Sequence, residues 1–453
     1  MRLSVCVLLL GAWSAGCSWT RYDDVVENSP IVLLSRPKAV SHGFGSSLAT
    51  ATVGSSVTLL VGGTPLRSGG AEFELGASDA PTVEARDTGH CLGSDAPCYF
   101  SSTPVALARA QGPGAPRPLC FVDGGGTASG ELGLAVRCTD DVEYALEVPE
   151  PVLELLEFSI ANAQPTPFRF AADRGPDPAL LATADEESAV WYYGPLSKAF
   201  DELPNPANAK GKWPKPELRT LSVARVGADA RLLAVGEPSA GSVRLFSAPE
   251  GEVPAYIGCL GGTPGFGRAF AAGPVLPGDD DDELVISDDA VVYVFDAAKL
   301  AELPPAVGTD CSLGALPAGA LVTSFTCGST KNISGCSSSE FGAALGVGDL
   351  DGDGDGEVVV GAPTMTVRHV ERAGALIIYD VEPPKTAKEH LYDFKDIAFL
   401  SSAEEGDQLG RSIALPDLGD RHVLAAGAPG GGKAAVFYCP TFLPAKLAGA
   451  RCQ

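Results

Sequence analysis

One stretch of the sequence concentrates the side chains that could bind a metal ion. It is Asp349–Glu357, in which a carboxylate stands at every second position and three glycines occupy sites between them. Alternate carboxylates in a tight loop can converge on one point, and glycine tolerates the backbone conformations that such a curve needs. Ca²⁺ takes six to eight hard oxygen ligands, which a loop of this kind can supply. The spacing therefore predicts a calcium loop.

The loop does not have the spacing of an EF-hand. A twelve-residue EF-hand loop needs a Glu at its last position. Counting from Asp349 places Val360 there, and counting from Asp351 places Ala362 there. The residues on both sides are runs typical of strands, so the loop is expected to join two strands.

Two other loops stand at equivalent places in the sequence. Residues 278–283 are strongly acidic but lack the alternating glycines, and Pro274 stands where the first ligand would be. Residues 417–420 keep the first aspartate but form a shorter loop. Whether either loop binds a metal is left open by the sequence.

The elements that position the acidic loop form a repeated pattern. Its clearest copy begins with Phe341-Gly342, continues through the loop to the strand-like run 358–363, and ends with the strand-like run 374–379. The order is strand, loop, strand, turn and strand. A Gly-Ala-Pro at 361–363 ends the second strand, and Gly374 permits the tight turn before the third.

Other parts of the chain repeat this order. Counting all copies gives seven units, a pattern typical of four-stranded blades that must stack around an axis to bury their faces. The further copies lie at 44–75, 132–146, 179–193, 231–246, 266–295 and 409–438.

These units resemble FG-GAP repeats, the propeller repeats of integrin α subunits. The resemblance implies an all-β fold, a seven-bladed β-propeller of four-stranded antiparallel blades over residues 37–453. It also implies that an early strand at Ile31–Leu34 completes the last blade. A pair of irregular β-sandwiches is the alternative. By the same resemblance, the ligands of Ca²⁺ are the side chains of Asp349, Asp351 and Asp353, the carbonyl of Asp355, and Glu357, where the family usually has Asp.

The N-terminus predicts export and lipid attachment. Residues 1–16 have the charged start, short apolar run and small residues of a secretory signal. Ser14-Ala15-Gly16-Cys17 resembles a bacterial lipobox, after which Cys17 would carry lipid and residues 17–36 would form a tether. Ordinary cleavage before Cys17 is the alternative. The expected location is the bacterial cell envelope, at the outer membrane, with the lipid on Cys17 as the contact with the membrane.

The cysteine count agrees with this expectation. Twelve cysteines are present, and removal of Cys6 with the signal and lipidation of Cys17 leave an even number. The remaining cysteines fall into neighbouring pairs that an oxidising compartment would allow to form disulfides. The pairs are Cys91 with Cys98, Cys120 with Cys138, Cys259 with Cys311, Cys327 with Cys336, and Cys439 with Cys452.

Composition narrows the function. The formal net charge is −25, which argues against binding to nucleic acid, whose phosphates require a basic surface. No pattern typical of a catalytic site involves the five histidines. We therefore expect a monomeric, non-catalytic lipoprotein that binds a protein or glycan partner, with Ca²⁺ as its cofactor. An enzyme with its site at the axial channel and a purely structural envelope lipoprotein are the alternatives.

Overall fold

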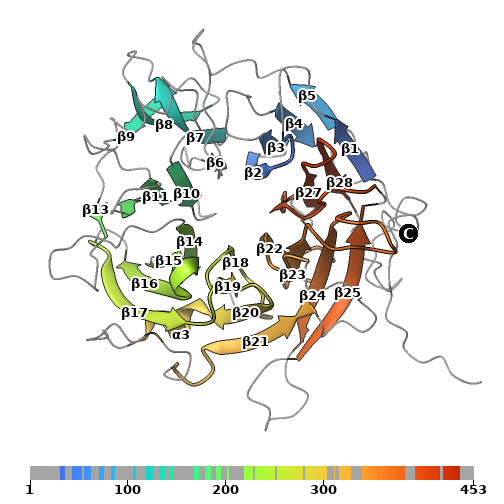
Figure 1. Ribbon diagram of the computed structural model, residues 1–453. Helices are drawn as coiled ribbons and strands as arrows, with labels where there is room; N and C mark the ends of the chain where they lie inside the picture. The colour runs from blue at the N-terminus through green and yellow to red at the C-terminus, as the bar shows by residue number, and fades with distance from the viewer. Residues whose placement is uncertain are drawn as a thin grey trace, which may run out of the picture.

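The chain folds into strands that pair almost entirely with their neighbours in sequence. A computed structural model describes residues 31–35, 43–53, 56–62, 71–75, 83–86, 106–108, 119–126, 132–138, 143–146, 168–172, 179–184, 190–194, 201–203, 219–227, 230–249, 252–278, 281–303, 311, 316–327, 339–382, 393–402, 404–418 and 422–438. The described strands form seven four-stranded sheets, and their pairings are antiparallel. Figure 1 shows the sheets arranged around a common centre. The predicted all-β propeller of antiparallel blades is confirmed, and the two-sandwich alternative does not fit.

The first three sheets of the chain have these bounds. One sheet contains β2 (Ser47–Val53), β3 (Ser56–Gly62), β4 (Ala71–Leu75) and β5 (Val83–Arg86). The next contains β6 (Ala106–Ala108), β7 (Leu119–Gly126), β8 (Leu132–Cys138) and β9 (Glu143–Leu146). A third contains β10 (Phe168–Ala172), β11 (Leu180–Ala184), β12 (Val190–Tyr193) and β13 (Asp201–Glu202).

The other four sheets follow the same order. One contains β14 (Thr220–Val226), β15 (Ala230–Glu237), β16 (Ser242–Pro249) and β17 (Ala255–Gly261), with the short helix η1 (Pro238–Ala240) between β15 and β16. The next contains β18 (Phe270–Gly273), β19 (Glu283–Ser287), β20 (Val291–Asp296) and β21 (Leu321–Thr326), with α3 (Ala297–Ala301) after β20. The sheet that carries the acidic loop contains β22 (Leu345–Gly348), β23 (Glu357–Ala362), β24 (Ala375–Glu382) and β25 (Asp393–Ser401). The last contains β26 (Ser412–Ala414), β27 (Leu424–Ala428), β28 (Lys433–Phe437) and β1 (Ile31–Ser35).

The last sheet is completed by the first described strand. β1 pairs antiparallel with β28, and Ile31 lies opposite Phe437. Leu34 is buried in the cluster that also holds residues of the following sheet. This pairing covers the open backbone edge of β28, which would otherwise be free to pair with another chain. The strand expected at Ile31–Leu34 is therefore present, and it joins the two ends of the described chain.

Apolar side chains between neighbouring sheets hold the arrangement together. Val294 of β20 and Val322 of β21 belong to the same buried cluster as Val358 of β23 and Ile377 of β24. Further clusters of this kind join the sheets of β10–β13 to β14–β17, of β14–β17 to β18–β21, and of β22–β25 to β26–β28. Because both faces of such sheets are buried, their middle strands are continuous apolar runs rather than alternating ones.

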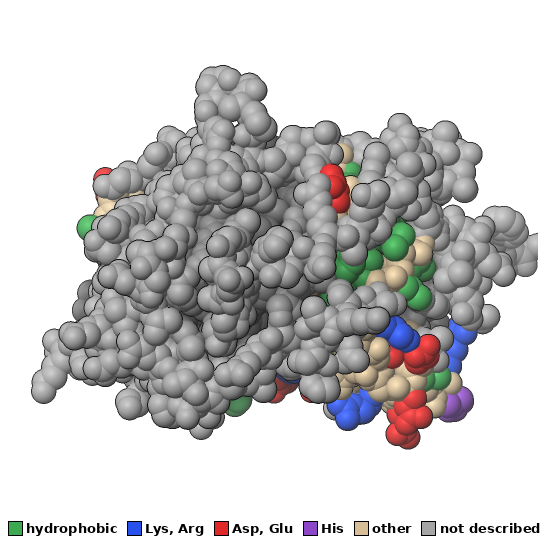
Figure 2. All heavy atoms as spheres, turned by 90° about the horizontal axis from the view of Figure 1, so that it is seen from above, with side chains coloured by type: hydrophobic (Ala, Val, Ile, Leu, Met, Phe, Trp, Pro, Cys, Tyr) green, Lys and Arg blue, Asp and Glu red, His purple; other side chains and the backbone are tan. Residues whose placement is uncertain are grey.

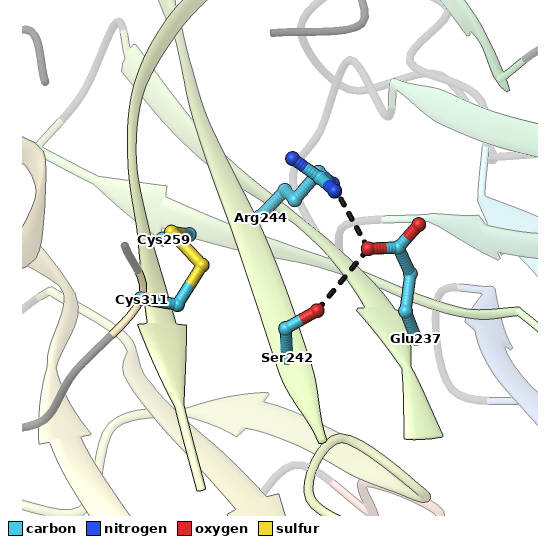
Figure 3. Close-up of a disulfide and its surroundings, with 5 residues drawn as sticks. All are labelled: Glu237, Ser242, Arg244, Cys259 and Cys311. Carbon is cyan, nitrogen blue, oxygen red and sulfur yellow. Dashed lines mark hydrogen bonds and ion pairs between the residues drawn. A yellow bond between two sulfur atoms is a disulfide. The ribbon is translucent and has the colours of Figure 1, made fainter. Parts of the chain in front are cut away.

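One predicted disulfide is confirmed. Cys259 in β17 is bonded to Cys311, and their Cα atoms are 5.0 Å apart (Figure 3). Cys327 is also disulfide-bonded. The backbones of Cys120 and Cys138 lie opposite each other in β7 and β8, and their pairing stays a prediction. The predicted pairs Cys91 with Cys98 and Cys439 with Cys452 lie outside the described residues.

The predicted signal, the lipid site at Cys17 and the tether up to residue 30 also lie outside the described residues. Among the described residues, no helix has the length and apolar character needed to cross a bilayer.

Candidate metal centre

The acidic loop connects two strands whose residues are all buried. β22 ends at Gly348 and β23 begins at Glu357, and these two residues are paired across the hairpin. Buried apolar positions on both strands therefore fix the two ends of the loop. Inside it, Gly352 and Gly354 have φ angles of 81° and 99°, in the region that favours glycine. The prediction of a tightly curved loop between two strands is confirmed.

Three carboxylates of the loop converge. Asp349, Asp351 and Asp353 each offer an oxygen, and these oxygens all lie within 4.8 Å of one another. In the described part of the chain, this is the only group of three or more potential metal-binding side chains. The sequence therefore identified the residues that the fold brings together.

Hydrogen bonds to the backbone hold these side chains in place. Asp349 accepts bonds from the N–H of Gly352 through Oδ1 (2.6 Å) and from the N–H of Gly354 through Oδ2 (3.0 Å). Asp351 accepts a bond from the N–H of Asp353 (3.2 Å), and Asp353 accepts one from the N–H of Asp355 (3.0 Å). Each aspartate thus turns the backbone that follows it, so the sequence spacing itself produces the curve.

Burial and the neighbouring charges disfavour ionisation of Asp351 and Asp355. Partial burial, followed by the charges of Asp353 and Asp349, raises the pKa of Asp351 to about 6. Burial and the same two charges also raise the pKa of Asp355. Like charges held close together raise a carboxyl pKa, and a cation among them reverses the effect. The donor set, three carboxylates without a neutralising side chain among the described residues, suits a hard divalent cation.

Glu357 occupies a different place from the three aspartates. It is 2 % exposed, and its Oε2 accepts a hydrogen bond from the backbone N–H of Leu350 (2.6 Å). Burial, reinforced by the charges of Asp351, Asp349 and Asp353, raises its pKa to about 9. The structure therefore gives Glu357 a role in holding the loop against the end of the hairpin. Its predicted role as the closing ligand, and that of the Asp355 carbonyl, stay predictions.

The preceding sheet repeats this device. Glu283 is the first residue of β19, as Glu357 is of β23, and it is paired with the last residue of β18. Its Oε2 accepts hydrogen bonds from the N–H groups of Val275 (2.6 Å) and Leu276 (3.1 Å). A buried glutamate at the start of the second strand thus clamps the loop in both sheets. In the sequence, the only sign of this role was an acidic residue directly before an apolar run.

The second acidic loop directs carboxylates at the neighbouring sheet. Asp282 Oδ2 accepts a hydrogen bond from the N–H of Arg225 (2.7 Å), and Asp281 Oδ1 accepts one from Gly227. These bonds attach the loop to the end of β14. Asp279 and Asp280 lie outside the described residues, so the open question of a metal at 278–283 is not resolved. The same holds for 417–420, of which Asp417 is bridged to His422.

The candidate metal loop is also wedged between its neighbours. A Cβ on Gly356 would lie 2.1 Å from the carbonyl oxygen of Pro274, which follows β18 in the preceding sheet. On the other side, the N–H of His422 donates to the carbonyl oxygen of Asp349 (2.6 Å). The loop therefore touches both adjacent sheets through its backbone, and its conformation is coupled to their packing.

A buried ion pair, which sequence reasoning missed, lies at the opposite end of another sheet. Glu237 stands where other copies of the repeat have the alanine of Gly-Ala-Pro. Its Oε2 accepts hydrogen bonds from Nε of Arg244 (2.9 Å) and Oγ of Ser242 (3.1 Å), as Figure 3 shows. Both partners come from β16, so the departure from the repeat is compensated on the adjacent strand. The replacement of alanine by glutamate was the signal available in the sequence.

Comparison with known families supports the identity of the unit that holds the loop. The FG-GAP repeat model matches residues 341–379, which include β22, the acidic loop, β23 and the first part of β24. A search of curated proteins found no match. The resemblance of this unit to an FG-GAP repeat is thereby confirmed.

Proposed function

We propose that this chain is a calcium-stabilised, seven-bladed FG-GAP propeller that serves as a non-catalytic binding scaffold for a protein or glycan partner. The observation that carries the proposal is the convergence of Asp349, Asp351 and Asp353 inside the unit that matches the FG-GAP repeat. A propeller of such repeats suggests a binding role, because its connecting loops gather at the two ends of a rigid ring of sheets.

In this proposal, Ca²⁺ is held by the side chains of Asp349, Asp351 and Asp353, with the Asp355 carbonyl and Glu357 completing the set. When bound, the ion would neutralise carboxylates that repel one another. Because Asp349 and Gly356 also contact the adjacent sheets, the ion would stabilise the packing between sheets as well as the loop.

We place the protein in the bacterial cell envelope, attached to the outer membrane by lipid on Cys17 after removal of residues 1–16. The lipobox-like residues before Cys17 support this placement. The test is incorporation of labelled palmitate by the expressed full chain. Label is expected in the wild type and absent in Cys17→Ser, and equal label in both would contradict the anchor.

The calcium site is tested by calorimetric melting of the mature protein with Ca²⁺ and with chelator. The informative variant is Asp353→Asn, which removes one charge but keeps an oxygen that can accept the N–H of Asp355. Glu405→Gln is the matched control, because Glu405 is exposed and lies outside the loop. Calcium should raise the melting temperature of the wild type and of the control much more than that of Asp353→Asn. Identical melting in all samples would refute the calcium site.

A further inference from the structure

A strained hairpin lies at one end of the sheet that carries the acidic loop, and the acidic loop lies at the other end. It follows β23. The backbone N–H of Val367 donates to the carbonyl oxygen of Val370 (3.1 Å), and the N–H of Val370 donates to the carbonyl oxygen of Val367 (2.9 Å). Arg368 and His369 form the two-residue turn between them, with φ angles of 50° and 70°. Turns with two positive φ angles normally use Asn and Gly, because side chains with a full Cβ substituent disfavour this conformation.

The surrounding backbone holds this conformation in place. The N–H of Gly374 donates to Met365, which is fully buried, at 3.1 Å. The loop after β25 adds a second set of bonds, in which Gly406 and Gln408 donate to the carbonyl oxygens of Glu371 (3.0 Å) and Arg372 (3.1 Å). Strained residues persist only where the structure around them determines their conformation, and they are frequent at binding sites.

The hairpin presents two arginines and a histidine whose side chains have no partner among the described residues. Arg368, His369 and Arg372 are exposed, and none of their side chains forms a hydrogen bond or ion pair with the described residues. We call Arg368–Arg372 the cationic tip. It also contains the exposed carboxylate of Glu371.

Several other charged side chains near this end of the propeller form ion pairs, although the exposed Glu405 forms none with the described residues. Glu340 binds Arg411 (2.7 Å) and Arg268 (3.4 Å), and Lys433 binds Glu404 (2.5 Å). Figure 2 shows a part of the surface where acidic, basic and histidine side chains lie close together. The cationic tip differs because its two arginines have no such partners among the described residues, in a chain whose formal net charge is −25.

We infer that the cationic tip binds the carboxylate groups of an acidic polysaccharide, an inference that rests on the proposed role as a binding scaffold. A guanidinium group matches a carboxylate through two parallel hydrogen bonds. The acidic protein as a whole repels anions, and this repulsion is weaker for a ligand with widely spaced carboxylates than for a densely charged polyanion.

The surface near the tip favours a glycan over a protein. Protein interfaces centre on large apolar or aromatic anchors. Among the described residues, the exposed large hydrophobic side chains are Leu33 and Val253, and neither lies in the tip or in the loop bonded to it. A polar ligand recognised through its charged groups suits this surface better.

The experiment measures binding of mature protein, with Ca²⁺ present, to oligosaccharides that carry glucuronic acid at every second sugar. The same oligosaccharides with their carboxyl groups reduced to alcohols are the matched ligand. Binding is expected for the acidic form alone. Comparable binding of both forms, or binding of an acidic peptide without binding of the oligosaccharide, would overturn the inference.

Variants test the assignment to the tip. Arg368→Gly with Arg372→Gly removes both charges and relieves the positive φ angles, so this variant should fold and bind at least about tenfold more weakly. Glu371→Gln should bind more tightly, and Arg411→Gln, outside the tip, should bind like the wild type. Unchanged affinity of the double glycine variant would refute binding of the ligand at the tip. Failure of the tip to bind the oligosaccharide would not change the calcium-dependent melting, so the two proposals can be refuted separately.

Discussion

The backbone N–H of His422 donates to the carbonyl oxygen of Asp349 across the boundary between two sheets, at 2.6 Å. The same relationship occurs two sheet boundaries earlier in the chain, where the N–H of Asp282 donates to the carbonyl oxygen of Arg225 at 3.1 Å. Each donor stands in the loop that leads into the second strand of its sheet. Each acceptor lies at the end of the first strand of the preceding sheet.

At the boundary between these two, where the sheet of β22–β25 follows that of β18–β21, a glycine stands in place of the donor residue. Gly356 lies at the corresponding place, and its Cα approaches the carbonyl oxygen of Pro274 so closely that no side chain fits. The contact between successive sheets is thus made by backbone at one recurring position. This explains how the loop that gathers Asp349, Asp351 and Asp353 is fixed on both sides.

Substitution of Gly356 tests this wedge. Gly356→Ala would place a Cβ 2.1 Å from the carbonyl of Pro274, so either the loop or the neighbouring sheet must move. We expect a loss of about 2–3 kcal/mol in the free energy of unfolding. Gly354→Ala is the control, because a Cβ there has no neighbour within 4 Å and only its φ of 99° is unfavourable. Chemical denaturation measures both, and an equal loss in the two variants would argue against the wedge.

Calcium should stabilise the folded protein by mass action. A ligand that binds only the folded state at one hundred times its dissociation constant contributes about 2.7 kcal/mol. Asp353→Asn should lose most of this increment, because the ion would lose one of its charged ligands. Denaturation across a calcium titration measures the effect. A wild type whose unfolding midpoint does not depend on calcium would contradict the prediction.

Variants of Glu357 distinguish its structural role in holding the loop from a role as a calcium ligand. In the metal-free protein its pKa is raised to about 9, so it is neutral at pH 7, and glutamine can accept the same bond from Leu350. Glu357→Gln should therefore leave metal-free stability nearly unchanged, whereas Glu357→Ala should lose about 2–4 kcal/mol of stability. Calcium titration of Glu357→Gln then decides whether the residue is also a ligand. Weaker calcium binding would support that role, and unchanged binding would restrict Glu357 to the clamp.

The raised pKa values predict opposite effects of pH on two quantities: the stability of the metal-free protein and its affinity for calcium. The folded-state pKa is about 6 for Asp351 and about 9 for Glu357, against ordinary values of 3.8 and 4.5. Between the unfolded and folded values the folded protein binds more protons, so these groups make the metal-free protein less stable as pH rises. Calcium affinity should instead fall below about pH 6, where Asp351 becomes protonated. Melting with chelator and calcium titration at pH 5 and pH 8 measure these trends, with Glu357→Gln to isolate the clamp.

The sequence predicted the elements around the acidic loop because periodicity and glycine placement are local signals. The strand runs on both sides of Asp349–Glu357 became β22 and β23, and the strand at Ile31–Leu34 became β1. The contacts of Glu357 and Glu283 with loop backbone were not predictable, because the sequence indicated Glu357 as a calcium ligand and Glu283 only as one acid of an acidic loop. The cationic tip was also missed, since Arg368 and His369 form a turn without the Asn or Gly that usually marks one.

The buried pair of Glu237 and Arg244 gives the last prediction. Glu237 and Arg244 occupy positions that hold Ala362 and Ile377 in the sheet of the acidic loop. Removing one partner of a buried pair leaves an uncompensated charge, so Glu237→Ala should lose about 3–5 kcal/mol of stability.

Replacing both residues tests whether the ion pair stabilises the fold, or whether its attraction only offsets the cost of burying the two charges. The double variant Glu237→Ala with Arg244→Ile restores the apolar pair of the other sheet, and an apolar replacement of a buried ion pair is often neutral or stabilising. We therefore expect the double variant to be close to the wild type in denaturation experiments. A double variant as unstable as Glu237→Ala would mean that Arg244 has a role beyond neutralising Glu237, since the apolar pair would not have repaired the site.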